Sequence, residues 1–514
     1  MEYEDSLKKI VKGAGIILGG TIFARILTFL YNIIIARIGA EVYGLFSISL
    51  AVLNVIVTLG ILGLETGIVR YISHYKGKQE LGLIKGAIKS TLKTGLLMSL
   101  IFTLLLFVFA DWISIYFFNN IQLTPFLKII ALAVPSTILS AILLRTLRSY
   151  LYAKYETYIK LLFESSAKII FTLIFFALGF KVLGAAMAYS AALLGTLFFS
   201  AYYVQKKVLF KLRQVKPINP PKKELIFYSL PLMFNEIGIT SILWIDTFMI
   251  PYFLDARSAG IYNVIILIVM MMSIVPHSLI YLFLPILTEF HSQNKKEIFV
   301  SLYKTCTKWI FAANIVIFAV FLLIPMEFIK VFFKEEYLKD SLVIFDTTFP
   351  ISIIILCILL IGFLIFNTLL SSKDILIIFK KTKFIAFNTI IAIFANILLN
   401  YYLIPILGII GAAIATTFSF IIGAVLIGIE AYIITKINVF KFNYFTIIFS
   451  AIFSLFLTFI FKDLLKLDDI SSLVVYPSIF TLLYLLLLFI TKSFEKEDIY
   501  IMNVLKRKLT NRSS

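Results

Sequence analysis

The stretch AGIILGGTIFARILTFLYNIIIA, residues 14–36, is apolar enough to cross a membrane, yet it carries Arg25 near its middle. A helix needs about 20 apolar residues to span the hydrocarbon core of a bilayer. A charge at mid-bilayer costs about 2.5–3.5 kcal/mol on insertion scales, so an intramembrane arginine predicts a functional or a pairing role. The rest of the chain indicates which kind of membrane protein holds it.

The composition places the whole chain in a membrane. Of its 514 residues, 61% are hydrophobic and 15% are charged, whereas soluble proteins carry about 25% charged residues. Two cysteines and three histidines form neither a disulfide framework nor a metal-ligand pattern, so no metal is expected. The start, MEYEDSLKKIVKG, lacks a signal-peptide pattern, and we expect the first span to be retained. These features predict an all-α integral membrane protein.

The apolar runs along the chain predict about fourteen transmembrane helices. The turns between them are short, so no connection is long enough to form a separate soluble domain. The predicted spans cover 13–36, 44–69, 94–110, 126–144, 161–179, 184–204, 225–253, 260–288, 309–325, 341–370, 384–401, 408–434, 443–461 and 472–491.

The positions of lysine and arginine predict the orientation. With the N-terminus in the cytoplasm, 36 of the 47 basic residues fall in cytoplasmic segments, eight fall outside and three lie within spans. Both termini are therefore predicted to be cytoplasmic in a multi-pass protein of the cell membrane. The same loops account for the net charge of +19, so we expect contact with lipid headgroups and no nucleic-acid partner.

Three pairs of similar segments predict an internal repeat. The segment GAEVYGLFSISL (39–50) resembles DARSAGIYNVII (255–266), and LLRTLRS (143–149) resembles IFNTLLS (365–371). In the same order, VLGAAMAYSAALLG (182–195) resembles IIGAAIATTFSFIIG (409–423). Both copies begin on the cytoplasmic side, which predicts two parallel six-helix bundles related by a pseudo-two-fold axis along the membrane normal. The predicted parts are residues 1–204, a basic linker at 205–223, residues 224–434, and two further helices with a tail at 435–514.

Arg25 belongs to a polar stripe on the first span. Thr21, Arg25, Thr28 and Asn32 fall within an arc of about 60° on a helix. Such a stripe cannot face lipid, so we expect it to line a water-accessible cavity between the bundles. One interpretation is an ion pair of Arg25 with Glu65 or Glu236; the other is a cation for phosphate oxygens, which suit the guanidinium fork.

Further charges within the spans extend this candidate site. Lys168 lies four residues after Glu164, which suits an internal salt bridge, but it can also supply a second cation to the cavity. Glu236 and Asp246 lie on neighbouring faces of the seventh span; pairing suits Glu236, and coupling to Na⁺ or H⁺ is an alternative for Asp246. No other cofactor is expected.

Basic side chains also gather where spans end at the predicted cytoplasmic mouth. They either define topology or collect substrate headgroup phosphates. The members of this rim are Arg70, Arg145 and Arg148, with His74.

Several segments resemble the Wzx-type oligosaccharide flippases, the polysaccharide transporters of the MOP superfamily, which are related to MATE exporters and lipid II flippases. The resemblance rests on NTIIAIFANILLNYYLIPILGIIGAAIATTFSF (388–420), RIGAEVYGLFSISLAVLNVIVTLGILGLETGIVRYIS (37–73) and DTFMIPYFLDARSAGIY (246–262). It implies transport of a polyprenyl-phosphate- or diphosphate-linked oligosaccharide from the inner to the outer leaflet. Related lipid-precursor flippases place an essential arginine in their first span, which favours the phosphate interpretation of Arg25.

Other function classes stay open at this point. A MATE-like, cation-coupled exporter of small molecules would prefer an acidic cavity, whereas Arg25 and Lys168 are basic. A membrane-embedded glycan polymerase or ligase would need positioned carboxylates on a sizeable outer loop, which this sequence does not offer. We therefore expect a transporter and not an enzyme, acting as a monomer that can associate with glycan-assembly enzymes.

Overall fold

The computed structural model describes residues 23–150, 152–218, 241–344, 346–439, 443–491, 493 and 498, and these residues are almost entirely helical. Eleven helices in this part of the chain are long and apolar enough to cross a membrane. Two predicted spans continue beyond the described residues, and their described parts are the apolar helices Phe23–Ala36 and Ser241–Phe253. The chain is thus a multi-pass, all-α membrane protein, while the count of fourteen spans stays a prediction.

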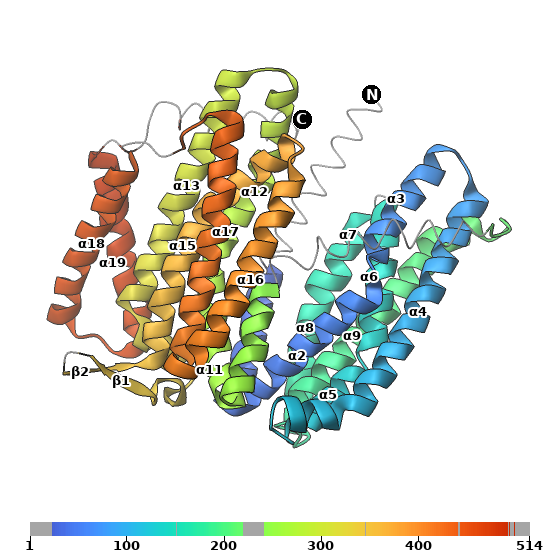
Figure 1. The fold of residues 1–514 in the computed structure, drawn as a ribbon, viewed down its shortest axis with the longest axis horizontal. Helices are drawn as coiled ribbons and strands as arrows, with labels where there is room; N and C mark the ends of the chain where they lie inside the picture. Colours follow the sequence, from blue (N-terminus) through green and yellow to red (C-terminus); the bar gives the residue numbers. More distant parts are fainter. Residues whose placement is uncertain are drawn as a thin grey trace. The chain divides into compact units, whose positions relative to one another are not determined.

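Contacts along the chain divide it into two compact units, Met1–Gly260 and Ile261–Ser514. In the first unit, long helices run beside one another, and short connections join them at either end (Figure 1). Its labelled helices are α2 (Ala40–Ile61), α3 (Leu64–Gly77), α4 (Leu81–Trp112), α5 (Leu123–Ala131), α6 (Val134–Ser149), α7 (Ala153–Glu156), α8 (Glu164–Ala177) and α9 (Gly184–Val204).

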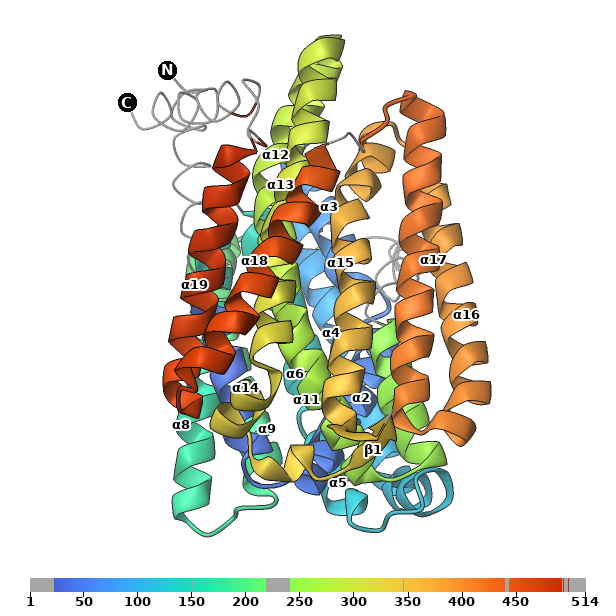
Figure 2. The same cartoon turned by 90° about the vertical axis from the view of Figure 1, so that its left-hand side faces the viewer.

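The second unit is built in the same way, with α16 and α17 forming a hairpin and α18 and α19 forming another (Figure 2). Its helix α11 (Ala256–Val269) begins in the last residues of the first unit. The others are α12 (Ile274–Ser292), α13 (Lys296–Leu323), α14 (Pro325–Phe332), α15 (Ile351–Ile378), α16 (Thr382–Leu407), α17 (Ile409–Thr435), α18 (Asn443–Leu465) and α19 (Asp469–Ile490).

A small β-hairpin corrects one predicted span. We predicted a helix over 341–370, but strands β1 (Ser341–Ile344) and β2 (Thr347–Pro350) precede α15, which begins only at Ile351. Two features favour this start: the turn places Asp346 at a φ of 59°, and Pro350 has no N–H to continue a ladder or a helix. Apolar content alone could not separate the strands from the helix.

Two further boundaries differ from the predictions. The predicted span 44–69 is broken, because Leu62 and Gly63 adopt positive φ values of 51° and 68° between α2 and α3. After α9, helical structure continues through a π-turn and a 3-10 turn to Leu212, inside the predicted linker. Lys85 then donates to the carbonyl oxygens of Leu212 and Val215, both at 2.8 Å, and so holds the end of this extension against α4.

The first turns of α2 and α11 meet within the first unit, at two glycines that the sequence comparison had paired. A Cβ on Gly44 would lie 1.8 Å from the carbonyl oxygen of Ala256, and a Cβ on Gly260 would lie 1.8 Å from that of Ala40. The contact is reciprocal, since each glycine faces the carbonyl oxygen of the residue four positions before the other glycine. Only glycine allows the two backbones to approach this closely.

The helices α18 and α19, which lie outside the predicted repeat, are anchored to α13 and α14. Lys462 on α18 pairs with Glu327 at 2.8 Å and also donates to the carbonyl oxygen of Leu323 at the end of α13. Tyr484 on α19 donates to the carbonyl oxygen of Ala312 at 3.2 Å. The hairpin is therefore part of the second unit.

Candidate functional site

The polar stripe around Arg25 occupies one side of the helix Phe23–Ala36. Thr21 and Glu236 lie outside the described residues, while Arg25 is partly exposed and Thr28 is exposed. The side chains of Phe23, Ile26 and Leu30 are also exposed, by 50%, 53% and 43%. At 100° per residue Phe23 and Leu30 project about 160° and 140° away from Arg25, and Ile26 projects about 100° away. The helix thus presents an apolar exposed face and a separate polar one.

Arg25 makes no ion pair with any residue in the described part of the chain. The predicted alternative partner Glu65 instead contacts Arg145, with 3.5 Å between Oε2 and Nε. An ion pair of Arg25 with Glu65 is therefore not formed in this structure. The possible pair with Glu236 stays a prediction.

Asn32, the last residue of the stripe, is hydrogen-bonded to α2. The Asn32 amide donates to the carbonyl oxygen of Thr28 at 2.8 Å, and its Oδ1 accepts from the Tyr43 hydroxyl at 3.1 Å. These bonds hold Asn32 in one orientation. Arg25 lies about two turns away on the same face, so the stripe combines a positioned amide with a guanidinium that keeps its hydrogen-bonding capacity.

Lys168 and Glu164 form a salt bridge of 2.7 Å on α8, and both side chains are less than a fifth exposed. The Lys168 ammonium also lies 4.3 Å from the ring centre of Tyr189 on α9, and Thr196 donates to the other Glu164 oxygen at 3.4 Å. The salt-bridge interpretation of this pair is confirmed. Because its charge is balanced locally, Lys168 is less suited than Arg25 to bind an anion alone.

The helix irregularity before this pair was not predicted. Residues Thr157–Phe163 form a π-helical segment between α7 and α8, directly before Glu164. Such segments are rare, and they occur frequently at functional sites because they shift the side chains that follow. No sequence pattern signals this one, since its residues are ordinary helix formers.

A row of aromatic rings joins the first helix to Lys168. Tyr31 contacts Phe46 edge to face at 6.1 Å, and Phe46 contacts Tyr189 at the same distance. Tyr189 in turn holds the Lys168 ammonium. The structure thus connects the stripe helix, α2, α9 and α8 through side chains that the sequence analysis did not select.

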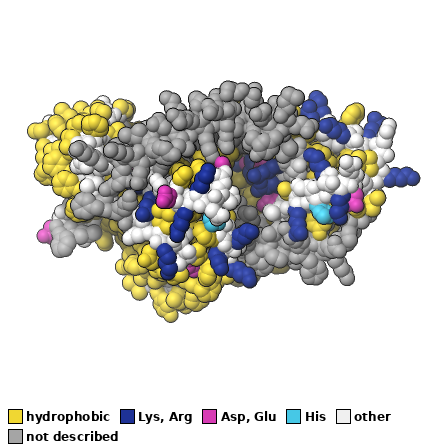
Figure 3. Space-filling model, turned by 90° about the horizontal axis from the view of Figure 1, so that it is seen from above, with side chains coloured by type: hydrophobic (Ala, Val, Ile, Leu, Met, Phe, Trp, Pro, Cys, Tyr) yellow, Lys and Arg dark blue, Asp and Glu magenta, His cyan; other side chains and the backbone are white. Residues whose placement is uncertain are grey.

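The arginines of the predicted basic rim differ in how far they are exposed. Arg145 bridges Glu65 and Glu156, each at 3.5 Å, and is therefore largely neutralised. Arg148 is exposed in the last turn of α6, and Arg70 is exposed in the middle of α3. Figure 3 shows that the face seen from above carries many lysine and arginine side chains and few acidic ones.

Asp246 is fully buried in the helix Ser241–Phe253, and the neighbouring Thr247 is 1% exposed.

The second unit contains a fully buried polar cluster of Asn396, Thr416 and Tyr262. Asn396 donates to the Thr416 hydroxyl at 3.2 Å, and the Tyr262 hydroxyl donates to the same oxygen at 3.3 Å. Among the described residues, no group of three or more His, Cys, Asp or Glu side chains could hold a metal ion.

Residues 10–291, more than half of the chain, match the family of polysaccharide biosynthesis proteins. The chain belongs to this family. An uncharacterized membrane protein of Methanocaldococcus jannaschii is 25% identical to it over 99% of this chain and 100% of its own length. The relationship therefore extends over both units.

Several solved membrane transporters share the fold of this family member. The lipid II flippase MurJ in an inward closed conformation is similar with a TM-score of 0.70 at 16% identity, over 91% of this chain and 96% of its own. A multidrug resistance MATE transporter in an inward-facing conformation gives 0.63 at 14% identity, over 80% and 94%. A MOP superfamily transporter from Pyrococcus furiosus gives 0.55 at 13%, over 85% and 95%. At these identities the likeness concerns the fold.

Proposed function

We propose that this protein is a flippase that moves a polyprenyl-phosphate- or diphosphate-linked oligosaccharide from the inner to the outer leaflet of the cell membrane. Membership in the polysaccharide biosynthesis family and the fold shared with the lipid II flippase MurJ support this substrate class. The substrate crosses by alternating access and leaves chemically unchanged. The product serves the assembly of cell-surface polysaccharides or glycans.

The observation that carries the proposal is the state of Arg25. It is partly exposed within an apolar helix, has no ion-pair partner among the described residues, and projects about 100–160° away from Phe23, Ile26 and Leu30. A cation in a membrane helix is costly unless it meets water or an anion. A guanidinium suits phosphate oxygens because its N–H groups form paired, charge-assisted hydrogen bonds.

The other charges take supporting roles in this proposal. Lys168 and Glu164 form a balanced pair that positions α8 against Tyr189, and Arg145 holds two helices through Glu65 and Glu156. Exposed Arg70 and Arg148 gather the anionic headgroup at the cytoplasmic mouth. Both termini lie in the cytoplasm. The protein acts as a monomer that contacts membrane lipids and can associate with glycan-assembly enzymes. Asp246 is the candidate for coupling to Na⁺ or H⁺.

The test compares substitutions of Arg25 in a reconstituted flipping assay with a labelled lipid-linked oligosaccharide. Arg25→Ala should abolish flipping while the thermal midpoint in detergent stays close to that of the wild type. Arg25→Lys should restore only part of the activity, because an ammonium keeps the charge but loses the bidentate geometry.

A double substitution separates this role from a structural one. If Arg25 only pairs with Glu236, Arg25→Ala should lower the thermal midpoint, and Arg25→Ala with Glu236→Gln should restore both stability and transport. Recovery of transport in that charge-free variant would reject phosphate binding by Arg25. Transport of small cationic dyes by the wild type, without transport of the lipid-linked sugar, would favour the MATE-like alternative.

A further inference from the structure

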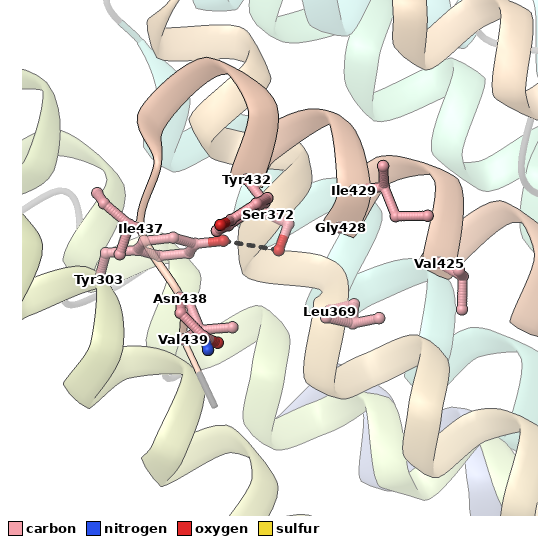
Figure 4. A pocket seen from close by; sticks show the side chains of 10 residues that line it. All are labelled: Tyr303, Leu369, Ser372, Val425, Gly428, Ile429, Tyr432, Ile437, Asn438 and Val439. Atoms are coloured by element: carbon pink, nitrogen blue, oxygen red, sulfur yellow. Dashed lines mark hydrogen bonds between the residues drawn. The ribbon is translucent and has the colours of Figure 1, made fainter. Parts of the chain in front are cut away.

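The second unit contains a cavity of about 370 Å³ at the end of α17 where α17 leads into residues 436–439. Its walls come from α13, α15 and α17 and from this connecting segment (Figure 4). No residue of the Arg25 stripe lines it. The cavity is therefore separate from the candidate site described above.

One wall of the cavity is an apolar face of α17 that is not covered by the rest of the unit. Val425, Gly428, Ile429 and Tyr432 repeat at helical spacing and line the cavity, and the three with side chains are 41%, 51% and 50% exposed. On a membrane-spanning helix, exposed apolar side chains at such positions face lipid. The cavity thus opens toward the hydrocarbon of the bilayer.

Gly428 creates the hollow in this wall. A Cβ at this position would lie 3.4 Å from Cδ2 of Leu369 on α15, so any larger side chain would extend into the space between α15 and α17. Tyr303 and Ser372 also line the cavity, and their hydroxyls hydrogen-bond to each other at 2.8 Å (Figure 4). Because these hydroxyls satisfy each other, they do not require a polar ligand.

The mouth of the cavity carries positive charge. Lys436 follows α17 directly, is exposed, and holds its ammonium 5.9 Å from the ring centre of Tyr432. Lys380, Lys381 and Lys383 are exposed in the turn between α15 and α16 at the same end of the unit. Basic residues near the membrane surface attract anionic lipid headgroups.

We propose that this cavity binds the hydrocarbon tail of an anionic phospholipid, whose phosphate lies beside Lys436. The tail contacts Val425, Ile429 and Leu369, and Tyr432 lies at the boundary between tail and headgroup, where an aromatic ring with a polar end is favoured. Charge complementarity at the mouth and the lipid-facing wall support this occupant. The lipid is a bound structural component and not the transported substrate, so the proposal does not depend on the proposed function.

The test uses native mass spectrometry of the full chain, purified in mild detergent and incubated with phosphatidylglycerol or with phosphatidylcholine. We expect the wild type to retain phosphatidylglycerol, and Gly428→Phe to reduce the retained fraction at least about fivefold by filling the cavity. The matched control Ile433→Phe changes an exposed α17 residue that does not line the cavity, and it should bind like the wild type. Lys436→Gln should lower the preference for phosphatidylglycerol over phosphatidylcholine.

Crosslinking of the wild-type protein makes the test independent of variant folding. In vesicles of phosphatidylcholine and phosphatidylglycerol, a phosphatidylglycerol with a diazirine in its tail should label residues 425–432 and Leu369. Retention of phosphatidylglycerol by folded Gly428→Phe, or labelling spread evenly over the lipid-facing helices, would overturn the proposal. Displacement of the bound lipid by one equivalent of polyprenyl phosphate would also overturn it, since the cavity would then be a substrate site.

Discussion

At the residue scale, the structure separates charges that are balanced from those that keep their binding capacity. Lys168 lies close to Glu164 and to the Tyr189 ring, and Arg145 bridges two glutamates. Arg25 is placed differently, on a partly exposed face and without an ion pair in the described residues. Charge alone thus does not identify the binding residue; the local partners do.

The Lys168–Glu164 pair predicts a specific pattern of stability. Lys168→Met should lower stability strongly, by an amount approaching the ~3–5 kcal/mol of a buried pair, because Glu164 would be left uncompensated among apolar side chains. Lys168→Met combined with Glu164→Leu should recover most of this loss. Thermal unfolding in detergent measures both effects.

A more exposed pair provides the control. Lys128 and Asp111 also form a 2.9 Å ion pair, but their side chains are 34% and 54% exposed. Lys128→Met should therefore lower the thermal midpoint much less than Lys168→Met does. Equal losses for Lys128→Met and Lys168→Met would contradict the role given to burial.

At the element scale, close backbone approach and capping decide where helices meet and begin. The first turns of α2 and α11 touch through Gly44 and Gly260. Helix α19 begins at Asp468, whose side chain accepts hydrogen bonds from the amides of Ile470 and Ser471, both at 3.2 Å. The close approach requires the absence of a Cβ at Gly44 and Gly260, and the cap requires the side-chain oxygen of Asp468.

The glycine contact predicts that Gly44→Ala is disruptive. A methyl group at Gly44 would meet the Ala256 carbonyl oxygen at 1.8 Å, so the helices must separate and their packing is lost. We expect a decrease of several degrees in the thermal midpoint. Gly77→Ala is the control, because a Cβ there meets nothing within 4 Å and alanine favours the helix; a similar decrease in Gly77→Ala would refute the contact argument.

The cap of α19 predicts a dependence on pH. Hydrogen bonds from Ser471 and Ile470 hold the pKa of Asp468 below its usual value. Since the folded-state pKa is the lower one, the cap stabilises the helix above the unfolded-state pKa and loses this effect as pH falls through the folded-state pKa. Asp468→Ala should speed amide exchange at Ile470 and Ser471 at neutral pH, and this difference should vanish in acid. A difference that persists in acid would show that the charge is not responsible.

Across the whole molecule, basic residues are predicted to be more frequent on one side of the membrane than on the other. In the second unit, Lys295 precedes α13 and Lys334 follows α14, so one membrane-spanning helix separates them. The predicted excess of basic residues assigns the Lys295 side to the cytoplasm. We therefore predict that Lys334 lies on the outer side.

Site-directed labelling tests that orientation. With Cys306 and Cys357 replaced by alanine, Lys295→Cys should react with a membrane-impermeant maleimide only after permeabilisation, and Lys334→Cys should react in intact cells. The two exposed positions serve as mutual controls. Labelling of both in intact cells would contradict the crossing of α13, and the reverse pattern would invert the topology.

Hydropathy and periodicity along the chain are enough to predict the class of the protein and several of its pairings. Hydropathy predicted the helices, since every spanning segment must satisfy its own backbone hydrogen bonds and cover itself with apolar side chains. Helical periodicity predicted the Glu164–Lys168 pair, because i and i+4 side chains meet on one face whatever surrounds them. Similar segments paired Gly44 with Gly260 before any contact was known.

The contacts between residues from distant segments become known only from the folded structure. It placed Glu65 beside Arg145, set Tyr189 against Lys168, began α15 after a β-hairpin, and left a cavity at Gly428. These outcomes depend on how helices far apart in the sequence pack, and packing is governed by the shapes and volumes of all neighbours together. The sequence of one chain shows helical periodicity, which depends only on neighbouring residues. Contacts between helices that are distant in the sequence form only when the chain folds.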